Sequence, residues 1–458
     1  MSVSPPFASS GAGDAPDAPD APAIPPIPPI SPPPQRRFLV EYAAVWRIPA
    51  IRWLALGNGL SNMIFFSTVI VRFEQSRGLD FTEIFLLESL VSLFAWLFDI
   101  PTGVWADQFG RKRLLLAGRA LNALSLVVTV LAQGFWPFAF GSLLFGVGLA
   151  CVSGCESALV YESLPAGSLQ TQAPSGAAAF ALLGTAQSGG FFVGLIAGSA
   201  LGAANLTLPV AASLVPAALA ILATGYLPAD APNHHKDAAT RAPRAPTPTL
   251  PAPTPPAPTT SPVTSPVSAQ QLMQSAWATV RTQPRLVALS LTQSGAFALV
   301  NAIFWYNQPY FARAKLPLVW YGPLTALAVG GGMLAPLALP WARRRLGARG
   351  ALAVTLLAPG LAYVALAFAH TSLAVVLLVA IVVGGAAWRD PLIQDELTRY
   401  APAEARATAL SALSALGTLA GVALNPLIGA LGDVNLAAVG LGIGGALLAL
   451  GLCAPWLL

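Results

Sequence analysis

The sequence DIPTGVWADQFGRKR, residues 99–113, places a charged turn between two long apolar segments. Apart from isolated carboxylates, residues 86–105 before the turn and residues 114–131 after it are apolar enough to cross a hydrocarbon layer about 30 Å thick. A soluble surface helix would instead be apolar along one face only. The stretch therefore predicts a hairpin at a membrane surface, with the basic residues 111–113 on the cytoplasmic side.

The composition agrees with this interpretation. Hydrophobic residues make up 55% of the chain and charged residues only 9%, compared with about 25% charged residues in soluble domains. The net charge of +5 comes from basic residues at the ends of apolar segments, which is typical of membrane topology signals and not of a nucleic-acid-binding surface. The 3 cysteines lie within apolar segments, so we expect neither a disulfide framework nor a metal site.

The chain divides into four parts. We expect residues 1–47 to form a disordered tail rich in Pro and Ala, and residues 229–277 to form a Pro-rich cytoplasmic linker. Residues 48–228 and 278–458 should each form a bundle of six helices. The expected spans are 53–71, 83–105, 113–133, 137–161, 177–202 and 205–227 in the first bundle, and 285–311, 317–341, 350–369, 371–393, 405–430 and 435–457 in the second.

Charge and repetition support this division. If the spans alternate in direction, most of the 24 Lys and Arg residues lie on one side, which predicts a multi-pass protein of the inner (plasma) membrane with both termini in the cytoplasm. Landmarks of the first half recur in the second at a nearly constant offset, for example Trp105-Ala106 and Trp341-Ala342, each before a basic cluster. We therefore predict an all-α integral membrane protein with twelve transmembrane helices in two pseudo-repeat halves.

The hairpin also carries a specific motif. The pattern Gly103-x-x-x-Asp107-x-x-Gly110-Arg111-Lys112-Arg113 resembles the loop between helices 2 and 3 of the major facilitator superfamily, and the chain resembles bacterial efflux-type members over residues 48–458. In that family the first glycine packs closely, the Asp faces the start of helix 11, and an Arg of the loop reaches an acid that ends helix 4. The resemblance implies a conformational gate formed by Gly103, Asp107, Gly110, Arg111, Arg113 and Glu162, with the helix 11 partner near Glu404.

Three carboxylates within predicted spans need an explanation, because an ionised side chain in the bilayer core costs about 2.5 to 3.5 kcal/mol on insertion scales. Glu88 and Asp99 lie about three helical turns apart and therefore face the same way, and Glu156 lies in a polar run. Desolvation favours the neutral form of a carboxylic acid, so Glu156, Glu88 and Asp99 are candidates for proton coupling. The alternative is that each is paired structurally with an Arg or a backbone group.

Polar and aromatic side chains recur along three other spans, on faces that could line a central cavity. Amides and hydroxyls beside aromatic rings suit a small, partly apolar organic molecule, although small polar residues also commonly join helices in membranes. The candidates for a substrate cavity are Asn58, Asn62, Phe65, Ser294, Asn301, Trp305, Gln308, Ser414 and Thr418.

These observations predict a transporter that works by alternating access, and most simply a proton-coupled antiporter for efflux that acts as a monomer. No Gly-Lys-Ser/Thr phosphate loop occurs, so we expect neither an enzyme nor a bound cofactor. Two departures from drug antiporters of the family favour a facilitator or importer instead: residues 177–202 lack a Gly-Pro pair, and residues 141–154 lack a buried Arg. A membrane receptor or scaffold with the same fold is the alternative from another class.

Overall fold

The computed structural model describes residues 41–164, 175–228, 284–385, 387–393, 406–453 and 456. The described residues are predominantly helical and contain no strand. Most of the predicted tail, the whole predicted linker and the stretch around Glu404 lie outside them. The folded part starts earlier than the predicted boundary at residue 48, because residues 41–46 are helical and Val45 is fully buried beside Ile51.

Each half is built from helices that the apolar runs of the sequence specify. The N-terminal half contains α2 (Pro49–Ser61), η1 (Phe65–Thr68), α3 (Ile70–Ser76), α4 (Phe81–Phe109), α5 (Arg111–Leu131), α6 (Phe135–Ser163), α7 (Gly176–Ala204), α8 (Thr207–Ala212) and α9 (Leu214–Gly225). The C-terminal half contains α12 (Pro284–Asn301), α13 (Ile303–Arg313), η2 (Leu318–Trp320), α14 (Tyr321–Leu334), η3 (Ala335–Ala338), α15 (Leu339–Phe368), α16 (Ser372–Gly385), α18 (Arg406–Val434) and α19 (Leu436–Cys453).

The described residues include 10 segments long and apolar enough to cross a membrane, and the pair Pro49–Thr68 and Ile70–Ser76, bent by 55°, adds one more. One of the segments, Leu318–Phe368, has 51 residues, whereas about 20 suffice to cross a bilayer. It breaks inside α15 at Gly347 (φ 69, ψ 176) and so comprises two spans. Dividing it brings the number to twelve, in agreement with the sequence prediction.

The two halves share a glycine turn at one end of the molecule and an arginine that caps a helix at the other. Gly110 (φ 94, ψ 140) separates α4 from α5, and Gly347 has the corresponding place in the C-terminal half; a positive φ of this kind favours glycine. We call the end of the molecule that carries these two glycines the hairpin end. At the opposite end, the far end, the Arg77 guanidinium donates to the carbonyl of Ala132 (3.2 Å) and the Arg313 guanidinium to that of Ala369 (2.8 Å). These arginines cap α5 and α15 in equivalent ways, which confirms the internal repeat.

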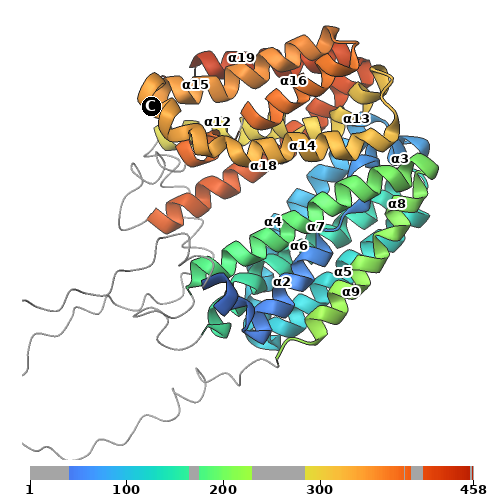
Figure 1. The fold of residues 1–458 in the computed structure, drawn as a ribbon, viewed down its shortest axis with the longest axis vertical. Coiled ribbons are helices and arrows are strands. Elements are labelled where there is room, and N and C mark those ends of the chain that lie inside the picture. The colour runs from blue at the N-terminus through green and yellow to red at the C-terminus, as the bar shows by residue number, and fades with distance from the viewer. Residues whose placement is uncertain are drawn as a thin grey trace, which may run out of the picture.

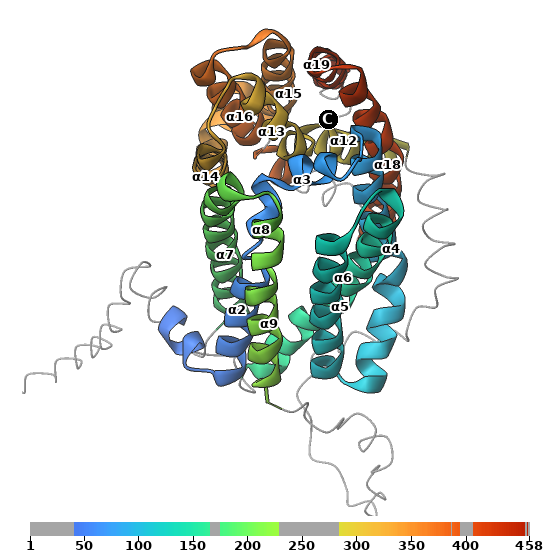
Figure 2. The same ribbon diagram turned by 90° about the vertical axis from the view of Figure 1, so that its right-hand side faces the viewer.

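The halves meet at the far end, where α3 and α13 lie side by side (Figures 1 and 2). The backbone N–H groups of Phe81 and Thr82, at the start of α4, donate to the Asp433 carboxylate near the end of α18 at 2.7 and 3.0 Å. The Gln308 amide donates to the carbonyl of Ser67 (3.2 Å), and the Ser199 hydroxyl donates to that of Val319 (3.0 Å). This network holds the halves together at the far end.

Candidate functional site

The described residues form at least two cavities between the halves. The first, of about 330 Å³, is lined by α4, α12, α13 and α18 and is rich in amides and hydroxyls; we call it the polar cavity. The second, of about 430 Å³, is lined by helices of the N-terminal half together with α12, α13 and α14 and is rich in phenylalanine; we call it the aromatic cavity. Glu88, Asn301 and Trp305 line both. The two cavities therefore adjoin at Glu88, in the first third of the long helix α4.

The polar cavity brings together more than half of the residues expected from the sequence to contact a substrate. Those that line it are Ser294, Asn301, Trp305, Ser414 and Thr418. Their neighbour Gln293 also lines the cavity and accepts a hydrogen bond from the buried guanidinium of Arg389 (3.1 Å). The regular turns of α12 place Ser294 and Asn301 on one face, and those of α18 place Ser414 and Thr418 on one face, as their spacing predicts.

The other four expected cavity residues, Asn58, Asn62, Phe65 and Gln308, line neither cavity. Asn62 donates to the carbonyl of Asn58 (3.0 Å), and the Gln308 amide binds the backbone of the other half at the far end. Phe65 donates its backbone N–H to the Ser213 hydroxyl (3.2 Å). For these residues the structure shows contacts between and within helices. The first span breaks between α2 and η1, so the helical face that carries Asn58 does not continue through Asn62 and Phe65.

The aromatic cavity contains a carboxylate that sequence reasoning missed. Glu74 lies on α3 and lines this cavity together with Glu88. The expected first span ends at residue 71, before Glu74, but the helix continues to Ser76. The apolar residues Val71 and Phe73 are the signal in the sequence that could have extended the helix, and both are buried in the structure.

Glu156 takes part in a buried polar network in the N-terminal half. Arg119 of α5 is 3% exposed and donates to the carbonyl of Ala220 (3.0 Å), to the Thr224 hydroxyl and to the Asn58 side-chain oxygen (2.7 Å). Glu156 interacts with the charge of Arg119 and with the Asn58 side chain, and its Oε1 is buried without a hydrogen bond. It lines neither cavity.

Arg119 is the second residue that sequence reasoning missed. It lies about two turns beyond the basic cluster of the hairpin, and in the sequence it is one of the 24 Lys and Arg residues whose distribution predicts the topology. An ionisable residue inside the apolar run of residues 114–131 is itself the signal that could have found it. Gly57 is part of the arrangement, since a Cβ atom at that position would overlap the Arg119 guanidinium.

Asp99, the third carboxylate of the sequence prediction, is exposed near the hairpin end and lines neither cavity. The structure therefore places the three carboxylates in three different environments. Glu88 lies between the cavities, Glu156 lies in a charged network, and Asp99 lies at the surface of the described chain.

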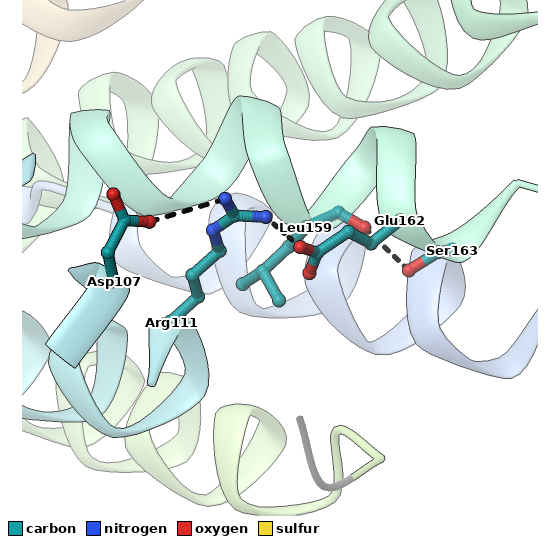
Figure 3. Close-up of polar contacts among 5 residues, drawn as sticks. All are labelled: Asp107, Arg111, Leu159, Glu162 and Ser163. Atoms are coloured by element: carbon teal, nitrogen blue, oxygen red, sulfur yellow. Dashed lines mark hydrogen bonds and ion pairs between the residues drawn. The ribbon is translucent and has the colours of Figure 1, made fainter. Parts of the chain in front are cut away.

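The hairpin forms a short chain of charges, shown in Figure 3. Arg111 pairs with Asp107 (Nη2 to Oδ1, 3.5 Å) on one side and with Glu162 on the other, so the contact of Arg111 with Glu162 that the family resemblance implies is present. Lys112 donates to the carbonyl of Gly225 (2.8 Å), and Arg113 is exposed.

Two other features implied for the hairpin differ from expectation or lie outside the described residues. The Asp107 side chain is 74% exposed, and the start of helix 11 near Glu404, its implied partner, is not among the described residues. A Cβ atom added at Gly103 would meet nothing within 4 Å in the described chain. The close packing implied at this glycine is therefore absent from this conformation.

Comparisons with known proteins agree with this architecture. A family model described as Major Facilitator Superfamily matches residues 53–425. A solved structure of a mutant of the nucleoside transporter NupG is similar with a TM-score of 0.71 and 14% identity, over 89% of this chain and 99% of that one. A mutant of the peptide transporter POT has a TM-score of 0.62 and 17% identity, over 92% of this chain and 98% of that one.

Two further relatives carry more specific descriptions. A bacterial homologue of the human lysosomal transporter Spinster, in an inward-facing and unoccupied conformation, has a TM-score of 0.58 and 17% identity, over 91% of this chain and 94% of that one. Myo-inositol transporter 1 of Saccharomyces cerevisiae is 30% identical over 89 residues. That match spans 19% of this chain and 15% of the yeast protein.

Proposed function

Because the chain belongs to the major facilitator superfamily, and its fold is that of a membrane transporter, we propose that it moves a small, partly apolar organic molecule by alternating access, most simply by exporting it in exchange for protons. The polar and aromatic cavities between the halves are where this substrate binds. The halves rock about them, so that each side of the membrane reaches the substrate in turn.

The position of Glu88 carries the proposal. Its carboxylate lines both cavities, so its charge acts on a molecule in either of them. Desolvation favours the neutral form of a carboxylic acid, and an opposite charge or a change in hydration favours the ionised form. Glu88 can therefore take up a proton when its environment is dry and release it when substrate or water enters.

The other two carboxylates take different roles in this proposal. Glu156 interacts with Arg119, so a proton on Glu156 would remove a charge from the network that joins α2, α5, α6 and α9. This makes Glu156 the second candidate for coupling, acting through helix positions and not through contact with substrate. The exposure of Asp99 supports a role in gating at the hairpin end.

Gating in this proposal uses the two ends of α4. At the far end, Asp433 holds the start of α4, and this contact breaks when the far end opens. At the hairpin end the gate consists of Gly103, Asp107, Gly110, Arg111, Arg113 and Glu162, and it closes when α18 approaches. The basic residues of both hairpins orient the hairpin end, and with it both termini, toward the cytoplasm of a cell whose inner (plasma) membrane holds the protein.

A facilitator or importer of a small metabolite is the second candidate. The match with Myo-inositol transporter 1 favours it, as does the sequence of residues 177–202, in which the Gly-Pro pair of drug antiporters is missing. The hydroxyl and amide groups of the polar cavity also suit a hydroxylated solute.

Reconstitution distinguishes these functions. Proteoliposomes that contain a pH-sensitive dye are exposed to a panel of organic amines, aromatic acids, nucleosides and polyols, and empty liposomes serve as controls. The proposal predicts that at least one compound causes proton movement that requires the protein. Tracer uptake without proton movement would support the facilitator instead. If no compound binds or moves, the receptor or scaffold alternative replaces both.

A further inference from the structure

The walls of the aromatic cavity are predominantly apolar, with aromatic rings among aliphatic side chains. Phenylalanine side chains contributed by both halves surround it, and Trp305 lies at its border with the polar cavity. The rings that enclose it are Phe66, Phe138, Phe145, Phe191 and Phe304. Such a surface favours an apolar or aromatic body, and the faces of aromatic rings attract a cation.

Some polar side chains that line this cavity lack a hydrogen-bond partner, whereas Ser67, Ser125 and Thr129 donate to backbone carbonyls. Glu74 is 8% exposed, and no hydrogen bond to its carboxylate occurs in the described structure. The side-chain oxygens of Thr68 (3% exposed) and Asn307 (5% exposed) are also buried without a partner, and both residues line the cavity. Buried acceptors without donors are costly unless a ligand supplies the donors.

The charged side chains that line the aromatic cavity are acidic, which favours a cationic ligand. Glu74 and Glu88 lie close enough to interact electrostatically, and among the described residues no Lys, Arg or His lines either cavity. An anion placed here would meet two carboxylates and no counter-charge. Burial and the neighbouring Glu88 favour the protonated form of Glu74 when no ligand or a neutral solute is present, whereas a bound cation would favour its ionised form and pair with it.

We propose that the aromatic cavity binds an amphipathic organic cation, with its ammonium group at Glu74, Thr68 and Asn307 and its apolar body against the phenylalanine rings. Glu74 is the anionic partner of this ligand, and Glu88 remains available for the proton. The claim that this ligand is also the transported substrate rests on the function proposed above. The claim that the cavity binds the ligand does not depend on that function.

Calorimetric binding to the full-length chain in detergent tests the proposal. The probes are naphthylmethylammonium, naphthylmethanol and naphthoate, which share a ring system and differ in charge. The ammonium compound should bind at least tenfold more tightly than the alcohol or the acid. Glu74→Gln should weaken binding of the ammonium compound at least tenfold and leave binding of the alcohol within twofold. Glu41→Gln, a matched change outside both cavities, should leave all three affinities within twofold.

Either of two results would overturn the assignment: the alcohol binds as tightly as the ammonium compound, or Glu74→Gln leaves the ammonium affinity within twofold. Retained binding of the alcohol shows that the variant cavity is intact. If Glu74→Gln does not fold, Asn307→Asp supplies the test, because an added carboxylate should raise the ammonium affinity severalfold, and an unchanged affinity would contradict the site.

The outcome is separable from the transport proposal. Cation binding without protein-dependent flux in proteoliposomes would contradict the proposed function and still support the cation site in the aromatic cavity. Proton-coupled flux of neutral compounds, without tighter binding of the ammonium probe, would support the proposed function and contradict the cation site.

Discussion

Asp433→Asn should open the far end of the molecule. The Asp433 carboxylate receives the N–H groups of Phe81 and Thr82 at 2.7 and 3.0 Å and the Thr82 hydroxyl, and so joins α18 of one half to the start of α4 in the other. Asparagine has one acceptor oxygen where aspartate has two and carries no charge. The variant therefore loses at least one charge-assisted hydrogen bond and the attraction between an anion and a helix N-terminus.

The size of the effect follows from these contacts. A hydrogen bond to a charged group contributes about 1.5 to 3 kcal/mol, and an anion at an exposed helix N-terminus about 0.3 to 1 kcal/mol. Asp433 is exposed to solvent, so we take roughly 1 to 2 kcal/mol for the combined loss. That amount shifts the ratio of far-end-open to far-end-closed molecules about 5-fold to 30-fold.

Cysteine labelling measures this shift. Cys151 and Cys155 are buried, so a variant with Cys453→Ser and Ser142→Cys places one reactive thiol in the aromatic cavity, which Ser142 lines. A membrane-impermeant reagent added from the far-end side should label this thiol about 5-fold to 30-fold faster when Asp433→Asn is also present.

Asp80→Asn is the matched control. Asp80 caps the same helix by accepting from the Glu83 backbone N–H (2.8 Å), but both residues belong to one half. Its labelling rate should stay within twofold of the parent. Equal rates for Asp433→Asn and the parent, or equal acceleration by both variants, would refute the assignment of Asp433 as the far-end contact.

Three further predictions concern stability and the chain outside the described residues. Arg119→Met leaves the buried Glu156 without its cation and should lower the free energy of unfolding by about 3 to 5 kcal/mol. Adding Glu156→Gln should restore part of the lost thermal stability, and no restoration would show that the two residues are uncoupled. Gly110→Ala forces a side chain onto φ 94 and should cost about 1 to 3 kcal/mol, whereas Gly103→Ala meets no atom and should leave the melting temperature in detergent nearly unchanged. Deleting residues 1–33 should leave membrane insertion and transport nearly intact, and loss of insertion in a fractionation assay would contradict a disordered tail.

The fold could be predicted from the sequence because a helix that crosses the bilayer must be long and apolar, and the apolar segments of this chain are easily recognised. Residues 83–105 were expected to span, and α4 runs from Phe81 to Phe109; Gly110 and Gly347 mark the turns that repeat in both halves. The spacing along α12 and α18 likewise predicted Ser294, Asn301, Ser414 and Thr418 as cavity residues, since regular helices carry their pattern directly into space.

The rest of the candidate site depends on breaks and partners that spacing does not encode. The first span breaks after Ser61 and continues through η1 and α3, which moves Asn62 and Phe65 off the expected face and brings Glu74 into the aromatic cavity. Arg119 resembles a topology signal in sequence, and only its contacts with Asn58 and Thr224 show that it is buried inside the half.

The most direct test of the account is the transport behaviour of Glu88→Gln. A substrate identified by the proton-flux panel is supplied to proteoliposomes that contain either the parent protein or this variant, with and without a pH gradient. The parent should concentrate the substrate against its own gradient. Glu88→Gln keeps the size of the side chain but fixes it neutral, so the variant should exchange substrate across the membrane without concentrating it. If Glu88→Gln concentrates the substrate as strongly as the parent, the carboxylate shared by the two cavities does not couple protons, and the central claim is wrong.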